Sequence, residues 1–106
     1  MKKIAFFVAI FVAGSAGQAF AGPNWLTGEI NNYTAIQGGI MIMLDTGIPD
    51  NCAGTGYGWM IVAETDKALT AVLLMRINQG NMGATVYSDG TFYQGFCRIV
   101  QLDPYD

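Results

Sequence analysis

The 106-residue sequence contains no histidine, only two cysteines and three prolines, and charged residues make up only 12% of it. Without histidine, the chain lacks the side chain that most often acts as a general base or binds a metal near neutral pH. The two cysteines do not form a C-x-x-C motif, and the carboxylates are scattered. We therefore expect no enzyme activity, no metal and no cofactor.

The N-terminal residues have the pattern of a secretory signal peptide. Lys2 and Lys3 precede an apolar run at 4–12, and small residues lead to Ala-Phe-Ala at 19–21. This run is too short to span a bilayer, so the pattern predicts cleavage after Ala21 and not a membrane anchor. We expect a periplasmic or secreted protein whose single domain covers residues 22–106, with no membrane span after cleavage.

The charge of the predicted mature chain argues against two classes of partner. Residues 22–106 contain three basic and eight acidic side chains, which gives a net charge of −5. An acidic chain repels phosphate backbones and anionic lipid surfaces. We therefore expect neither nucleic acid nor a membrane surface as a partner.

Cys52 and Cys97 are the only cysteines. In an oxidising compartment, an even number of cysteines without metal-ligand spacing is typical of disulfide bonding. The sequence therefore predicts one Cys52–Cys97 disulfide, which would stabilise a small domain substantially.

Hydrophobic patterning and turn residues predict five strands and one helix. The expected strands are 25–33, 40–44, 57–63, 82–88 and 92–102, and the expected helix is 67–78. Thr65 is the expected N-cap of this helix, and Gly80 its left-handed C-terminal residue. Asp89-Gly90 is the expected hairpin turn between the last two strands, and Gly95 is a candidate bulge beside Cys97.

The element order β-β-β-α-β-β is that of an OB-fold, a small five-stranded barrel whose helix follows the third strand. We therefore expect a mainly β fold with one α-helix (α+β) and an OB-like barrel. An open five-stranded sheet with the helix packed across it is the alternative architecture.

The expected helix has two distinct faces. Bulky residues suited to pack on the sheet lie on one side: Leu69, Val72, Leu73 and Ile77. Ala68, Ala71 and Met75 lie on the other side, where charged residues are usual. Because a face without charge is generally covered, we expect these three residues to form the interface of a homo-oligomer.

Aromatic residues near the strand ends are the candidate ligand-binding side chains. Sugars stack on such rings while amides and carboxylates bind their hydroxyl groups. The candidates are Trp25, Tyr33, Tyr87, Asp89 and Tyr93, with Phe92, Asn31, Asn32 and Ser88 nearby. The alternative role of the aromatic side chains is to close the ends of the hydrophobic core.

Several segments together resemble a known family. Residues 52–59 with their cysteine, the helix ending at Gly80, and the strand at 84–87 resemble small secreted bacterial proteins related to the B subunits of subtilase-type and pertussis-like AB5 toxins. The resemblance covers the C-terminal part of the chain. It implies an OB-fold, a ring of subunits with helices around a central pore, and glycan recognition on the outer surface. It assigns no binding residue, because no sugar-binding motif matches residue by residue.

Together these observations predict an exported, non-catalytic binding protein that forms homo-oligomers and recognises a glycan or another protein. A periplasmic inhibitor or immunity-type partner of another protein is the main alternative, because small acidic disulfide-bonded domains suit that role. A structural envelope protein is the third.

Overall fold

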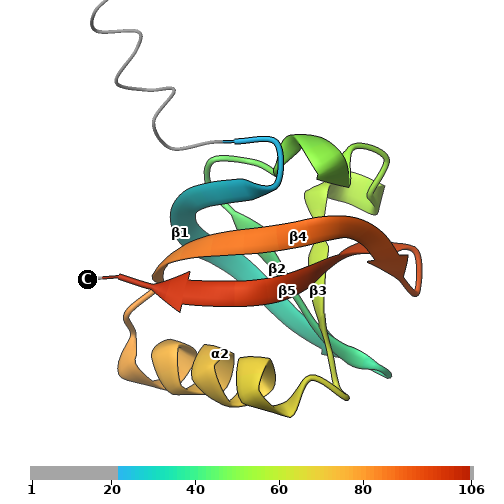
Figure 1. Ribbon diagram of the computed structural model, residues 1–106. Helices are drawn as coiled ribbons and strands as arrows, with labels where there is room; N and C mark the ends of the chain where they lie inside the picture. Colours follow the sequence, from blue (N-terminus) through green and yellow to red (C-terminus); the bar gives the residue numbers. More distant parts are fainter. Residues whose placement is uncertain (1–21, 106) are drawn as a thin grey trace, which may run out of the picture.

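The protein folds as a closed five-stranded β-barrel with one α-helix, seen in a computed structural model that describes residues 22–105 (Figure 1). The predicted signal peptide, residues 1–21, lies outside the described residues. The regular elements are β1 (Trp25–Ile36), β2 (Gly39–Leu44), β3 (Met60–Ala63), α2 (Lys67–Gln79), β4 (Gly83–Tyr93) and β5 (Phe96–Pro104). The expected OB-like barrel and the order β-β-β-α-β-β are confirmed, and the open-sheet alternative is wrong.

Strand β1 closes the barrel because it pairs with two neighbours. Its first part, from Trp25 to Glu29, is antiparallel to β4, and its second part, from Ile30 to Ile36, is antiparallel to β2. An irregularity between Ile30 and Asn32 interrupts the pairing of β1 with β2 near the start of the second part. The strands follow one another around the barrel as β1-β2-β3-β5-β4, and β3 and β5 are parallel.

The core fills the interior of this barrel. Alternate side chains of the strands point inward, as the two-residue period of a strand requires. Fully buried members include Ile42, Met60, Val86 and Ile99. Met41 and Ile61 are also buried, although they lie opposite each other outside this core cluster. Buried side chains thus lie on both faces of β2 and β3, which explains why the sequences of these strands are apolar at nearly every position.

Helix α2 lies below the barrel in Figure 1 and packs its bulky side against it. Leu73 is completely buried, and the partly buried Leu69, Val72 and Ile77 pack on the core. Gly80 adopts the expected left-handed conformation at the C-terminus. The expected N-cap is wrong: Asp66, not Thr65, is the N-cap, and no side chain caps the first turn.

The hairpin between β4 and β5 differs from the sequence prediction. Strand β4 continues through Asp89-Gly90, where the pairing with β5 shifts register, and the chain turns at Gln94-Gly95. Gln94 and Gly95 both have positive φ, which is typical of a two-residue type I′ turn. Asp89-Gly90 is therefore part of a bulge, and Gly95, the candidate bulge residue, lies in the turn.

The segment between β2 and β3 is attached to the barrel by the disulfide. It contains two short 3₁₀ turns, η2 (Asp50–Cys52) and η3 (Gly56–Gly58), and β3 begins at Met60 and not at residue 57. The predicted Cys52–Cys97 bond is present and joins residues 45 positions apart. Both cysteines are fully buried, and the Ser88 hydroxyl lies 3.1 Å from Cys97 Sγ.

We predict that the double variant Cys52→Ala/Cys97→Ala loses about 4 kcal/mol of unfolding free energy, because the unfolded chain gains the entropy that the cross-link removes. Urea unfolding of the purified protein measures this loss. Ser88→Ala is the control: it removes one hydrogen-bonding hydroxyl and should cost only about 1 kcal/mol. Two free thiols in the purified wild type, or equal losses in both variants, would contradict this role of the disulfide.

Candidate functional site

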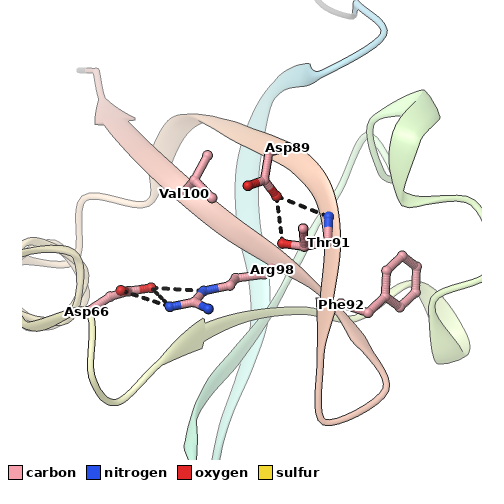
Figure 2. A pocket seen from close by; sticks show the side chains of 6 residues that line it. All are labelled: Asp66, Asp89, Thr91, Phe92, Arg98 and Val100. Atoms are coloured by element: carbon pink, nitrogen blue, oxygen red, sulfur yellow. Dashed lines mark hydrogen bonds and ion pairs between the residues drawn. The ribbon is translucent and has the colours of Figure 1, made fainter.

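A pocket of about 320 Å³ lies where the hairpin of β4 and β5 approaches the start of α2 (Figure 2). Its lining residues come from three elements or their flanks: Asp66 before α2; Asp89, Thr91 and Phe92 on β4; and Arg98 and Val100 on β5. The pocket is therefore lined by two carboxylates, one guanidinium and two apolar residues, although the Phe92 ring points away from Arg98 and Asp89 (Figure 2).

Strand alternation places the β5 residues of the pocket. Cys97 and Ile99 are fully buried in the core, so the intervening Arg98 and the following Val100 project to the outer face of the barrel. The pocket is thus outside the barrel, with the rigid core behind it.

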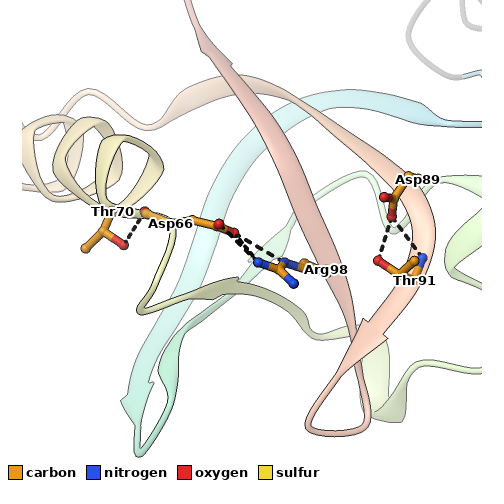
Figure 3. A network of polar contacts seen from close by, with 5 residues as sticks. All are labelled: Asp66, Thr70, Asp89, Thr91 and Arg98. Atoms are coloured by element: carbon orange, nitrogen blue, oxygen red, sulfur yellow. Dashed lines mark hydrogen bonds and ion pairs between the residues drawn. The ribbon is translucent and has the colours of Figure 1, made fainter.

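Arg98 is held in a fixed orientation from two sides. Its Nη2 donates to both carboxylate oxygens of Asp66, at 3.0 and 3.1 Å, and its Nε donates to Oδ2 at 3.2 Å (Figure 3). The guanidinium carbon also lies 5.4 Å from the centre of the Tyr93 ring, within the range of a cation–π contact. Because the two charged side chains are 31% and 27% exposed, this ion pair adds little stability and serves mainly to orient Arg98.

Asp89 is oriented by the bulge of β4. Its Oδ1 accepts hydrogen bonds from the backbone N–H of Thr91 at 3.0 Å and from the Thr91 hydroxyl at 2.6 Å. The hydroxyl bond, followed by the backbone bond, lowers the pKa of Asp89 below its ordinary value of 3.8. Asp89 is therefore a carboxylate at neutral pH, and its Oδ2 is left to accept a further hydrogen bond.

The arrangement offers a donor, an acceptor and apolar surface to one small ligand. Among residues 22–105, the hydrogen bonds of Arg98 use Nε and Nη2, so Nη1 remains as a donor. Asp89 supplies the acceptor, and the exposed Val100 supplies apolar contact. A group that both donates and accepts hydrogen bonds next to a C–H face, such as a sugar ring, matches this set.

The structure brings some of the sequence-predicted ligand residues together and separates others. Asp89 lines the pocket, and Tyr93 lies against Arg98 at its side. Trp25 and Tyr87 are cross-strand neighbours on β1 and β4, and neither lines the pocket. Tyr33 lies opposite Ile42 in the pairing of β1 with β2, and it does not line the pocket either.

The sequence interpretation missed the residue that organises the site. Arg98 stands between Cys97 and Ile99, and this alternation was the signal that it faces outward. Its partner Asp66 stands just before the expected helix, and nothing in the local sequence links positions 66 and 98. Ser88, considered near the aromatic candidates, is buried and belongs to the surroundings of the disulfide.

Comparisons of the chain with protein-family models, with curated proteins and with solved structures gave no match. The resemblance to toxin B subunits therefore remains an expectation from the sequence. Within residues 22–105, no helix is long and apolar enough to cross a membrane.

We predict that Asp89 titrates below pH 3.8 and that Thr91→Val moves its pKa upward, because the strongest stabilising bond to the carboxylate is lost. Because the folded-state pKa is lowered, the carboxylate stabilises the fold above the unfolded-state pKa, and this stabilisation disappears as the pH falls through the folded-state value. Side-chain carboxyl chemical shifts against pH measure the effect. Thr85→Val, outside the pocket, is the control. An unchanged Asp89 titration in Thr91→Val would contradict this assignment.

Proposed function

We propose that this chain is an exported, non-catalytic binding protein that recognises a glycan in the pocket around Arg98 and Asp89. The observation that carries the proposal is the juxtaposition of an oriented guanidinium and an oriented carboxylate beside the exposed side chain of Val100. Export rests on the signal-peptide pattern at residues 1–21.

The charge of the pocket favours a polar ligand without strong charge. Asp66 and Asp89 outnumber the single cation Arg98, and Asp66 already pairs with it. A phosphate would meet two carboxylates and one engaged guanidinium, which opposes its binding. Hydroxyl groups instead bind both to a donor such as Arg98 and to an acceptor such as Asp89.

A binding role without catalysis is consistent with the residue types of the chain. The sequence has no histidine, and its two cysteines are joined to each other. A disulfide sulfur cannot act as a thiolate nucleophile. The oriented groups of the pocket are thus suited to hold a ligand in place.

We also propose that the protein forms a homo-oligomer, in which copies of the chain associate through the outer side of α2. Ala68 and Ala71 are exposed there, and Leu74 and Met75 are each 49% exposed. Leu74 thus joins Ala68, Ala71 and Met75, the three interface residues that were predicted from the sequence. Small side chains permit close approach of a second helix, and the two larger ones supply apolar area to bury.

We predict that Asp89→Asn weakens glycan binding by at least about tenfold, because a hydrogen bond to a charged group contributes roughly 1.5–3 kcal/mol. A printed array of bacterial and host glycans identifies the binders, and calorimetry with the strongest one gives the affinities. Asp103→Asn is the control, because it removes the same charge from an exposed position on β5 that does not line the pocket.

An array without any bound glycan would overturn the glycan proposal and favour the inhibitor-type or structural alternatives. Equal loss of affinity in Asp89→Asn and Asp103→Asn would contradict the assignment of the pocket as the binding site. A purified protein that hydrolyses a glycoside, ester or peptide, and loses this activity on a single substitution in the pocket, would overturn the non-catalytic role.

We predict that Ala71→Glu produces a folded but smaller species, because it places a charge at the centre of the proposed contact between helices. Light scattering measures the mass, and circular dichroism measures the fold. Gln101→Glu, which adds the same charge to an exposed position on β5, should leave the mass unchanged. A wild type that is monomeric at working concentration would contradict association through α2.

A further inference from the structure

Tyr57 is the most exposed large hydrophobic residue among the described residues 22–105, with 92% of its surface accessible. It lies in η3 between Gly56 and Gly58, and its backbone has φ 56° and ψ 22°. This left-handed conformation is unfavourable for a residue with a Cβ. The loop thus holds an aromatic ring in solvent at a position where glycine would fit the backbone better.

Two contacts fix the loop that presents Tyr57. The Thr55 hydroxyl donates to the Trp59 carbonyl at 2.6 Å, across the turn. The same oxygen accepts the backbone N–H of Cys97 at 3.0 Å, which attaches the turn to β5. With the nearby disulfide at Cys52, these bonds define where the Tyr57 side chain leaves the surface.

The loop adjoins the outer face of β5 that carries the pocket. Phe96, Arg98 and Val100 are successive alternate residues of β5, separated from one another by about 6.5 Å. A Cβ atom on Gly56 would lie 3.3 Å from the Phe96 ring, so η3 lies beside the first residue of this row. The pocket around Arg98 and the loop of Tyr57 are thus connected along one strand through Phe96.

We propose that Tyr57 forms a second subsite that stacks on a further sugar unit of the same glycan, so that the ligand is an oligosaccharide and not a single sugar. This inference rests on the proposed glycan recognition in the pocket. The Tyr57 ring supplies a flat apolar surface for the C–H face of a pyranose.

The chemistry of the loop favours an uncharged sugar at this subsite. Residues 53–59, Ala-Gly-Thr-Gly-Tyr-Gly-Trp, contain no charged side chain. Because 92% of the Tyr57 surface is accessible, both faces of its ring are open to a ligand. An acidic or basic peptide would find no complementary charge here.

The test compares sugars of increasing length on three variants. Tyr57→Asn removes the ring and retains a residue that tolerates positive φ, so the fold is preserved. Tyr57→Phe keeps the ring and loses only the hydroxyl group. Asp89→Asn alters the pocket. The probes are lactose, N-acetyllactosamine, chitin and mannose oligosaccharides of one to six units, with affinities measured by calorimetry.

We expect Tyr57→Asn to weaken binding of the longer saccharides by about tenfold. Its affinity for the shortest bound saccharide of the same series, and its thermal stability, should equal those of the wild type. Tyr57→Phe should bind like the wild type, and Asp89→Asn should weaken short and long saccharides alike.

Equal binding of long saccharides by Tyr57→Asn and the wild type would overturn the second subsite and leave the pocket proposal intact. Absence of binding to every probe by the wild type would overturn both. Binding of the wild type to phosphatidylcholine vesicles, lost in Tyr57→Asn, would assign the ring to a lipid surface and overturn the saccharide subsite.

Discussion

Cys97 is the residue at which the barrel, the long loop and the face that carries the pocket are joined. Its disulfide holds Cys52 of the η2 turn, its backbone N–H binds Thr55, and its strand position lies opposite Met60 of β3. Within residues 22–105, the pairing of β3 with β5 comprises only Met60 with Cys97 and Ile61 with Arg98. Because so short a parallel pairing gives few hydrogen bonds, the covalent link beside it supports the closure of the barrel.

This junction also controls the geometry of the outer surface. Since Cys97 is buried with its sulfur in the core, the next residue, Arg98, must project outward, where Asp66 and Tyr93 fix its guanidinium. A shift of one residue in β5 would exchange the inner and outer side chains of the whole strand. The disulfide excludes that shift, and it therefore maintains the pocket as well as the core.

The sequence predicted what depends on strong local or compositional signals. The element order, the packing side of α2, its Gly80 terminus and the Cys52–Cys97 pairing follow from such signals, and all are confirmed. Asp89-Gly90 misled the hairpin prediction because Asp-Gly also suits a bulge, and the real turn uses Gln94, a residue without a turn preference. Arg98 and Asp66 could not be paired from the sequence, because only the closed barrel brings these distant positions together.

The position of Asp66 connects the two surfaces of the proposed function. Asp66 is the N-cap of α2, its carbonyl accepts the hydroxyl of Thr70, and its carboxylate orients Arg98 in the pocket (Figure 3). Ala68 and Ala71 begin the exposed side of the same helix. A partner bound to that side, as proposed above, would restrain the first turn of α2, and with it the carboxylate that holds Arg98. Association through α2 would therefore lower the entropy that Arg98 loses when it binds a ligand, which couples assembly to recognition through one side chain.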